Sequence, residues 1–336
     1  MATKQYTQQM NETENKTVEY KNTLLDRYWE YQRSRYPDWR RYFERPQAQD
    51  GRPPVFLVQE AWRNVIVNPD ADLKNQTALQ NMIPEGEHHK WFRSLNSSQA
   101  LALSVFGNLV LHNASDVLTG LTDGDGNNLF GLSPITLENF SLEHKIDFLG
   151  ERRRTSLDAF LSGAQRVAIE CKYTEQEFGT CRRPKLSPGE DEFQQEHCNG
   201  SYEYQAGRVE RCPLTISGVR YWEFVPGLFK FGNADDHKPC PLNKNYQLVR
   251  NILAIGLQEE DTQISLEKGH VVVVYDERNP AFQKGGGAVD SYLETKSALK
   301  NPQMLRKCSW QMIIHAMRQR KVLGWLTEEL AAKYGF

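Results

Sequence analysis

The sequence predicts an α/β fold in which a mixed sheet is flanked by helices, and three patterns along the chain indicate it. An amphipathic helix pattern starts at residue 97, three strand-like runs follow it over short connections, and a second amphipathic helix precedes a wholly apolar run. The predicted core order is therefore helix, three strands, helix, strand. Of the 336 residues, 39% are hydrophobic, which is enough for a sizeable core.

The first helix and the three strands are defined by their apolar spacing. In "SSQALALSVFGNLV" (97–110) a serine can cap the helix, and Leu101, Val105 and Leu109 form one apolar stripe. The strand-like runs that follow are residues 142–150, 155–163 and 166–173. Because only a few residues connect them, neighbouring strands are expected to pair antiparallel.

The second half of the core repeats the helix and strand signals. In "NYQLVRNILAIGL" (245–257), Leu248, Ile252 and Ile255 lie on one helical face. "GHVVVVYDERN" then contains a short run without polar alternation, a pattern typical of a strand that is covered on both faces.

Three additions surround this core. Residues 1–96 are expected to hold a polar, irregular lead-in and a helical extension. A Cys-, Pro- and Gly-rich insertion at about 175–242 interrupts the core of the fold, which comprises residues 97–276. Residues 277–336 are expected to form helices packed on the core. 

Charge and hydropathy restrict the cellular setting. With 41 basic and 43 acidic residues the net charge is −2, so a nucleic-acid site would have to be a local basic patch. No N-terminal signal pattern and no apolar run long enough to span a membrane occurs. We therefore expect a cytoplasmic protein with no membrane association.

The end of the third strand carries charged residues that a buried strand rarely has. Alternation along the strand places Glu170 and Lys172 on one face and Cys171 on the other. A hairpin would bring Asp158 across from Glu170. Two neighbouring carboxylates resist ionisation unless they share a cation, and Mg²⁺ is commonly held by one or two carboxylates, waters and a substrate phosphate. Lys172 would stabilise an attacking hydroxide and the charged transition state.

The Glu-x-Lys spacing has little specificity by itself. It recurs elsewhere in the chain, for example at Glu19/Lys21, Glu143/Lys145 and Glu294/Lys296. Glu143 and Lys145 lie on a predicted strand, but no acidic residue on a preceding strand completes their cluster. Context therefore favours Glu170 and Lys172, and from the residues alone an edge salt bridge stays an equal alternative.

Asp158, eleven intervening residues and then Glu170-Cys171-Lys172, in this order of elements, resemble the PD-(D/E)XK nuclease superfamily with its restriction-endonuclease-like fold. More narrowly, "TSLDAFL", "VAIECKYTE" and "YQLVRN" are similar to a bacterial family of restriction endonucleases. The resemblance covers about residues 97–276.

The resemblance implies roles for individual residues. Asp158 and Glu170 would bind Mg²⁺, for which Mn²⁺ can substitute, with the Cys171 carbonyl as a further ligand and Lys172 assisting the attacking water. Where relatives carry an acidic residue on the first helix, this chain has Gln99, whose neutral amide could position water or the metal ion. Leu157 replaces the proline before the first aspartate. Glu175 is expected to support these groups from the periphery.

Basic and cysteine residues near the predicted centre suggest two further sites. Phosphate contacts are expected from Arg152, Arg153, Arg154, Arg182, Arg183 and Lys185, with Gln247, Arg250 and Asn251 as further candidates. A structural zinc site or an iron–sulfur cluster could be formed by Cys181, Cys198, Cys212 and Cys240, with His197 and His237 nearby. No Cys-x-x-Cys motif supports a metal there, so small buried thiols are the alternative.

The predicted function is a Mg²⁺-dependent endonuclease that hydrolyses phosphodiester bonds in double-stranded DNA, leaving 5′-phosphate and 3′-hydroxyl ends by resemblance. The alternatives are a non-cleaving nucleic-acid-binding or interaction protein of the same fold and a repair or defence nuclease without a fixed recognition sequence. By analogy, a homodimer and a methyltransferase or other defence-system partner are expected.

Overall fold

The computed structural model describes residues 2–45, 51–70, 72–84, 86–131, 135–163, 165–181, 212–230, 240–257 and 263–336. Its centre is a five-stranded mixed sheet with the order β1-β2-β3-β4-β5. The strands are β1 (Phe140–Ile146), β2 (Thr155–Leu161), β3 (Arg166–Cys171), β4 (Gly269–Tyr275) and β5 (Leu305–Ser309). β1, β2 and β3 pair antiparallel, whereas β3–β4 and β4–β5 are parallel. The α/β fold with a mixed sheet is confirmed.

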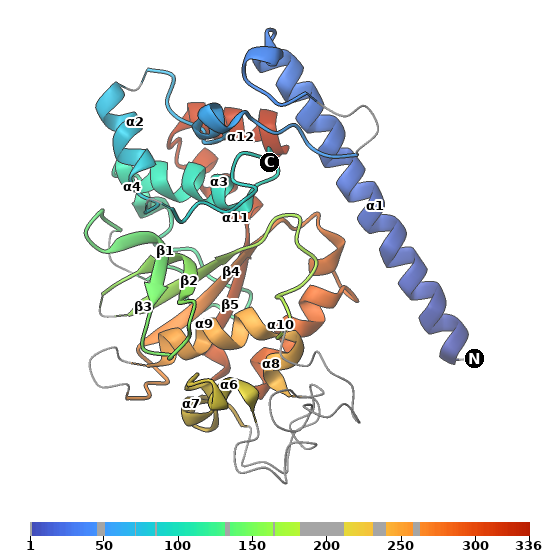
Figure 1. The fold of residues 1–336 in the computed structure, drawn as a ribbon, viewed down its shortest axis with the longest axis vertical. Coiled ribbons are helices and arrows are strands. Elements are labelled where there is room, and N and C mark those ends of the chain that lie inside the picture. Colours follow the sequence, from blue (N-terminus) through green and yellow to red (C-terminus); the bar gives the residue numbers. More distant parts are fainter. Residues whose placement is uncertain are drawn as a thin grey trace.

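Helices cover both faces of this sheet (Figure 1). The α-helices are α1 (Ala2–Arg35), α2 (Leu73–Gln80), α3 (Ser98–Ala102), α4 (Asn108–Leu111), α6 (Pro213–Ile216), α7 (Tyr221–Leu228), α8 (Pro241–Lys244), α9 (Tyr246–Gly256), α10 (Gly287–Ala298), α11 (Trp310–Gln319) and α12 (Gly324–Tyr334). Short 3₁₀ turns are Trp39–Arg41, Val58–Asn64, Ser115–Val117, Pro280–Phe282 and Pro302–Met304.

The two faces of β4 show why its sequence is apolar throughout. Val272 and Val274 pack into the core beneath α3, α4, α11 and α12, whereas Val271 and Val273 pack against α7 and α9 on the other side. All four valines are fully buried. A strand with helices on both faces needs apolar residues at every position, so the interpretation of this run as a doubly covered strand is confirmed.

The first core helix forms as its sequence predicts, with one irregularity. The Ser97 hydroxyl caps it by accepting a hydrogen bond from the Ala100 N–H at 3.2 Å. Between α3 and α4 the residues Leu103–Gly107 form a π-helical turn. A Cβ at Gly107 would lie 2.6 Å from Leu79 Cδ1, so this turn can pack closely only because position 107 has no side chain.

The sequence predicts helices and no strand after residue 277, but the structure contains a fifth strand there. "LRKCS" (Leu305–Ser309) contains two basic residues in five and has no apolar run, so its strand character cannot be recognised locally. Pairing with the buried β4 imposes it, and Trp310 begins α11 directly after it. Charged residues on short edge strands are common because they discourage pairing with other chains.

The N-terminal segment is helical, whereas its polar sequence predicts an irregular lead-in. Residues from Ala2 onward belong to α1, which runs along one side of the molecule in Figure 1. Tyr20 is buried, and its hydroxyl donates to Asp276 Oδ2 at 3.0 Å and lies 3.0 Å from the Tyr173 carbonyl oxygen. Tyr28 and Tyr31 are buried as well, and Tyr36, Trp39 and Tyr42 pack against the same core.

Within the part of the chain that the structure describes, every helix is too short or too polar to cross a bilayer.

Candidate active site

The three antiparallel strands bring three carboxylates into one row. The β1–β2 ladder pairs Leu142 with Ala159 and His144 with Leu157, so Glu143 lies opposite Asp158. The β2–β3 ladder pairs Ala159 with Ile169, and the next step of this register places Asp158 opposite Glu170. Asp158 is therefore the middle carboxylate, with an acidic neighbour on each adjacent strand.

Asp158 and Glu170 are held in different ways. Asp158 Oδ2 accepts a hydrogen bond from the Cys171 N–H at 2.7 Å, whereas its Oδ1 has no hydrogen-bond partner among the described residues. Glu170 is only 3% exposed, and both of its oxygens are engaged. Oε1 lies 2.7 Å from Lys172 Nζ, and Oε2 accepts from Asn251 Nδ2 at 2.6 Å.

Lys172 is a buried ammonium with a fixed position. Besides its ion pair with Glu170, Nζ donates to Gln247 Oε1 at 2.8 Å. Its backbone is anchored by Val274, whose carbonyl accepts from the Lys172 N–H at 2.7 Å, and by Trp310, whose Nε1–H donates to the Lys172 carbonyl at 3.0 Å. The side chain is thus aimed at the carboxylate row by contacts from two strands and two helices.

Two residues of α9 contact the Glu170–Lys172 pair. Gln247 and Asn251 lie four residues apart and so share one helical face, from which they reach Lys172 and Glu170. We expected both as phosphate-contact candidates. Their hydrogen bonds hold the Glu170–Lys172 pair, and Gln247 and Arg250 both line the open cleft.

Glu143 belongs to the site although its sequence context does not predict it. Its φ of +51° is unusual for a residue inside a strand. The carboxylate accepts from Ser156 Oγ at 2.6 Å and from Gln99 Nε2 at 2.5 Å. Gln99, expected where relatives carry an acidic residue, therefore contacts a carboxylate that comes from β1.

Crowding of acidic groups changes the proton affinities in the row. Burial, the charge of Glu170 and the charge of Glu143 hold the pKa of Asp158 well above its ordinary value. Burial also raises the pKa of Glu143. For Lys172, burial alone would lower the pKa, but the carboxylates around it raise it, so this side chain stays an ammonium.

The row lies in an open cleft of about 1130 Å³, whose lining also contains five basic side chains, which we call the basic rim, and the further acidic residues Glu87, Glu151 and Glu177. The basic side chains that line it are Lys90, Lys145, Arg153, Arg154 and Arg250. A neighbouring hollow of about 620 Å³ shares Arg153 and Arg250 with it and is also lined by Arg152. Arg182, Arg183 and Lys185 lie outside the described residues.

Glu175 lies at the edge of this cleft. Its Oε1 accepts from Ser98 Oγ at 2.8 Å and its Oε2 from the Tyr173 N–H at 2.6 Å. The side chain thus fixes the chain just beyond β3 to the start of α3, and its charge contributes to the raised pKa of Lys172.

Across the described ranges, no group of three or more His, Cys, Asp and Glu side chains is arranged to hold a metal ion. At the carboxylate row, Lys172 and Asn251 contact both oxygens of Glu170. The donor set nevertheless fits Mg²⁺, which takes carboxylate oxygens and is usually completed by waters and substrate phosphates rather than by a full protein cage.

The cysteine insertion is only partly described. Cys212 is buried at the start of α6, and burial raises the pKa of its thiol. Cys181 and Cys240 are partly buried near α9, whereas Cys198, His197 and His237 lie outside the described residues. The structural zinc site stays a prediction.

A sheet with antiparallel β1–β3 and parallel β3–β5, covered by helices on both faces, is consistent with an α/β protein that has a restriction-endonuclease-like core. Comparison with protein families leads to the same class, because residues 6–335 match REase-ARP, described as "Restriction Endonuclease associating with ARP". The match covers nearly the whole chain, so the chain belongs to this family, whose description indicates a nuclease-like role. Among curated proteins and among solved structures no match is found.

Proposed function

We propose that this protein is a Mg²⁺-dependent endonuclease of the PD-(D/E)XK type that hydrolyses phosphodiester bonds in double-stranded DNA. The observation that carries the proposal is the row of Glu143, Asp158 and Glu170 beside the buried ammonium of Lys172, inside a cleft with a basic rim. Carboxylates crowded in this way destabilise one another unless a cation joins them.

The residues of the chain would divide the work as follows. Asp158 and Glu170 would hold Mg²⁺, together with the Cys171 carbonyl, and the bound ion would activate water and offset charge on the phosphate. The Lys172 ammonium would lie beside the attacking water and stabilise negative charge in the transition state. Gln247 and Asn251 would keep Lys172 and Glu170 in position, and Glu143 would orient Gln99 at the cleft wall.

The ion pair between Lys172 and Glu170 is also what the non-cleaving alternative predicts. That alternative does not account for Asp158, whose carboxylate lies between two others without a cation of its own and whose pKa is raised by burial and by both neighbours. Carboxyl groups with strongly raised pKa values are typical of catalytic sites. The raised pKa of Asp158 therefore favours an enzyme over a binding protein.

Digestion of supercoiled plasmid by the purified protein tests this function. We expect cutting with Mg²⁺ or Mn²⁺ and none with EDTA. Unrelated plasmids then separate a sequence-specific enzyme, which gives discrete fragments, from a repair or defence nuclease, which gives smears. If DNA stays intact at every metal concentration while the protein is folded, the non-cleaving alternative replaces the proposal.

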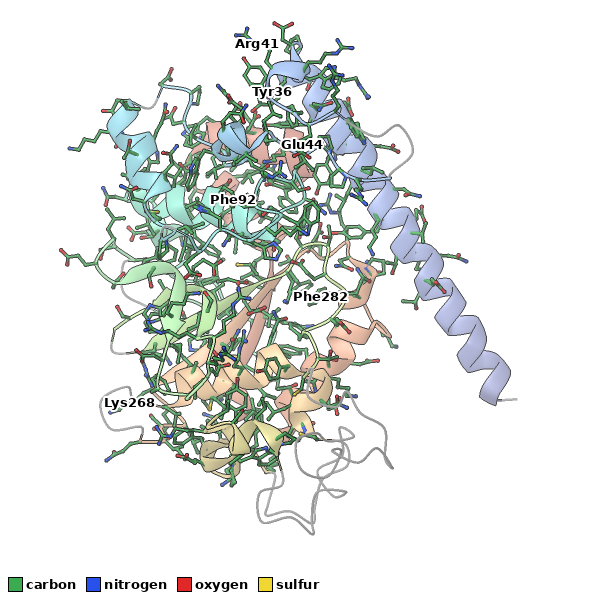
Figure 2. All side chains as sticks on the ribbon, in the orientation of Figure 1. Tyr36, Arg41, Glu44, Phe92, Lys268 and Phe282 are labelled. Carbon is green, nitrogen blue, oxygen red and sulfur yellow. The ribbon has the colours of Figure 1, made fainter. Side chains whose placement is uncertain are left out.

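Removing two arginines of the rim should weaken DNA binding without removing the chemistry. In Arg153→Ala/Arg250→Ala, the salt slope of DNA affinity should decrease by ~1–2, since each lost phosphate contact removes about 0.9. Fluorescence anisotropy of a labelled duplex over a salt series measures this slope. Lys268, labelled in Figure 2, precedes β4 at the end of the strand away from the cleft, so Lys268→Ala is the matched control. An unchanged slope in the double variant would show that Arg153 and Arg250 do not contact the DNA phosphates.

The partners expected by analogy stay proposals. Double-strand cutting by one site per chain calls for two copies, so we propose a homodimer on DNA, which sedimentation of the protein with and without duplex can test. A methyltransferase or another defence-system partner is proposed on the same basis.

A further inference from the structure

Part of the cleft wall has no task in the proposed chemistry. Residues 86–91 precede α3, and residues 86–90 line the cleft that contains Asp158. We call residues 86–91 the cleft segment. Its side chains at positions 89, 90 and 91 are exposed. Because exposed loop residues beside a site commonly bind its ligand, the contacts of this segment indicate what it can hold.

The amide of Gln99 fixes the cleft segment to the carboxylate row. Its Oε1 accepts a hydrogen bond from the His89 N–H at 2.8 Å, and its Nε2 donates to the Glu87 carbonyl at 3.0 Å. The same Nε2 donates to Glu143 at 2.5 Å. An ionised carboxylate at position 99 could donate neither of the last two bonds, so this position requires an amide. The segment and the row therefore keep a fixed relative position.

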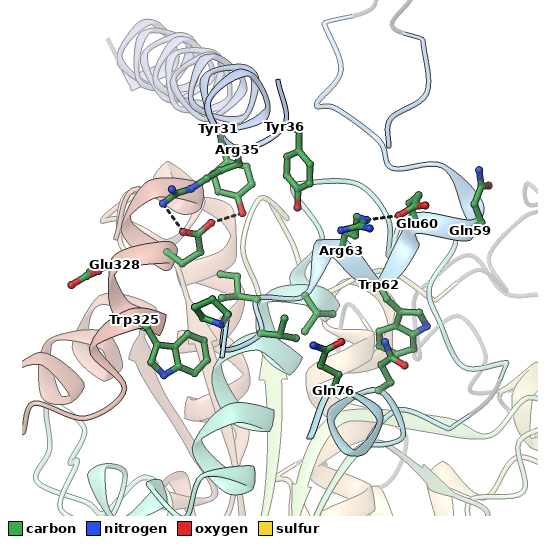
Figure 3. Close-up of a pocket in the computed structure, with 16 residues that line it drawn as sticks. Tyr31, Arg35, Tyr36, Gln59, Glu60, Trp62, Arg63, Gln76, Trp325 and Glu328 are labelled. Carbon is green, nitrogen blue, oxygen red and sulfur yellow. Dashed lines mark hydrogen bonds and ion pairs between the residues drawn. The ribbon is translucent and has the colours of Figure 1, made fainter. Parts of the chain in front are cut away.

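Two side chains of the cleft segment are engaged by the protein itself. The His88 ring packs edge-on against Trp62, with ring centroids 4.8 Å apart, and lies 4.7 Å from the ring of Phe92. Trp62 belongs to the wall of a neighbouring cavity (Figure 3). The Glu87 carboxylate pairs with Lys145 of β1 at 2.5 Å. Positions 87 and 88 thus anchor the segment and are not free for a ligand.

The next two side chains offer hydrogen-bond donors that the described part of the protein does not use. His89 Nδ1 accepts from the Trp91 N–H at 3.2 Å, so the neutral ring carries its proton on Nε2. Lys90 Nζ lies 5.1 Å from the centroid of the Trp91 ring, a cation–π contact that restrains the ammonium. Among the described residues, Lys90 has no carboxylate partner and His89 Nε2 has no hydrogen-bond partner. Both donors are available to an anionic ligand.

Cations reach the cleft from both helical layers. Lys90 follows His89, which is held by Gln99 of α3 on one face of the sheet. Arg250 lies on α9, which covers the other face, and it too has no carboxylate partner in the described ranges. The carboxylate row is on the strands between these layers. A ligand with phosphates on two sides, as in a DNA duplex, matches this distribution of charge.

From these observations we infer that the cleft segment is a DNA-contacting element. Lys90 and His89 bind phosphates of the DNA backbone, and Gln99 positions them relative to the carboxylate row. The inference rests on the proposed function, since the ligand is the DNA that this function assigns to the cleft. Backbone contacts of this kind fix the position and orientation of a protein on the duplex, so the segment sets which phosphate reaches the row.

The salt dependence of DNA affinity tests the contact of Lys90. In the cleavage-blocked Asp158→Asn protein, Lys90→Ala should decrease the salt slope by ~1, since one phosphate contact contributes about 0.9. His89→Ala should weaken binding at every salt concentration. Fluorescence anisotropy of a labelled duplex measures both effects. Lys74, exposed on α2 and outside the cleft, supplies the control Lys74→Ala, which should leave the slope unchanged.

A double-mutant comparison tests the positioning role of Gln99. Gln99→Met keeps the length of the side chain but removes its hydrogen bonds to the segment. If Gln99 positions Lys90, then Lys90→Ala should weaken DNA binding by a smaller factor in the Gln99→Met protein than in the protein with Gln99. Equal factors in the two backgrounds would contradict this role.

Photo-cross-linking tests the contact directly and without cleavage. The cross-linking residue p-benzoylphenylalanine is placed at position 90, 250 or 74 of the Asp158→Asn protein, which is then irradiated with a labelled duplex. We expect cross-links to DNA from positions 90 and 250 and none from position 74. No cross-link from position 90, or an unchanged salt slope in Lys90→Ala, overturns the inference.

Position 250 separates failure of the inference from failure of the proposed function. A cross-link from position 250 without one from position 90 overturns the inference and leaves DNA as the ligand of the cleft. No cross-link from either position removes DNA as the ligand and both proposals with it. A cross-link from position 90, in a protein whose wild type leaves plasmid intact, retains the DNA-contacting segment and removes the nuclease.

Discussion

Replacing Asp158 by asparagine is expected to abolish plasmid cleavage and, in the absence of metal, to raise the melting temperature of the protein. The amide has the same shape as the carboxylate and can still accept the hydrogen bond from the Cys171 N–H. It removes the negative charge that faces Glu143 and Glu170. We expect cleavage to fall roughly 100-fold or more, as when a single charge-stabilising group is lost from other enzymes.

The stability gain has a separate physical cause. Because burial and, after it, the neighbouring carboxylates raise the pKa of Asp158 above its unfolded value, ionisation of this group at neutral pH costs folding free energy. A gain of ~1 kcal/mol corresponds to about 2–4 °C in a domain of 150–250 residues. Calorimetry in EDTA measures the shift, and Asp70→Asn, at an exposed position, makes the same charge change as a control. Cleavage by Asp158→Asn within a few-fold of wild type would exclude Asp158 from the centre.

Replacing Lys172 by alanine is expected to reduce cleavage ~10²–10³-fold and to destabilise the protein. The loss of stability follows because Glu170, only 3% exposed, would keep Asn251 but lose its cation. Breaking a buried ion pair in this way typically costs ~3–5 kcal/mol.

Mg²⁺ distinguishes the two interpretations of this ion pair. If Glu170 is a metal ligand, removal of the ammonium frees Oε1 for the ion, and Mg²⁺ should raise the melting temperature of Lys172→Ala more than that of wild type. If the pair is only a salt bridge, Mg²⁺ should change neither protein. Thermal unfolding over a Mg²⁺ series measures the difference, with Lys268→Ala as the control for a lost lysine.

The sheet could be predicted where its signals are local. Alternation and short connections are enough to identify β1, β2 and β3 and their antiparallel pairing. The predicted third strand runs two residues too far, because the chain turns after Cys171 and the Tyr173 N–H bonds to the Glu175 side chain. β5 could not be predicted, since only its partner β4 makes it a strand.

The sequence predicts those residues of the candidate site that lie on the β2–β3 hairpin or directly after it. Asp158, Glu170 and Lys172 follow from the spacing within β2 and β3 and from the family resemblance. Glu143 depends on the register of β1 and on a positive φ, neither of which a Glu-x-Lys motif reveals. The signal that could have found it is the three-strand order itself, which places Glu143 across from Asp158.

The outer parts of the chain were least predictable because distant segments stabilise them. Tyr20 reaches Asp276 across 256 positions of sequence, and the buried Lys333 reaches the Asn64 side chain at 2.7 Å across 269 positions. Such contacts turn a polar N-terminal stretch into a packed helix, and no local pattern encodes them.

The central claim is that Asp158 and Glu170 form a metal site used for cleavage. Its most direct test is to titrate Mn²⁺ into the protein bound to a non-cleavable duplex and to count free Mn²⁺ by electron paramagnetic resonance. The account predicts that wild type binds Mn²⁺, and that Asp158→Asn binds it at least ~10-fold more weakly while retaining DNA, in parallel with its loss of cleavage. Equal Mn²⁺ binding by the two proteins, or cleavage that persists without Mn²⁺ binding, would contradict it.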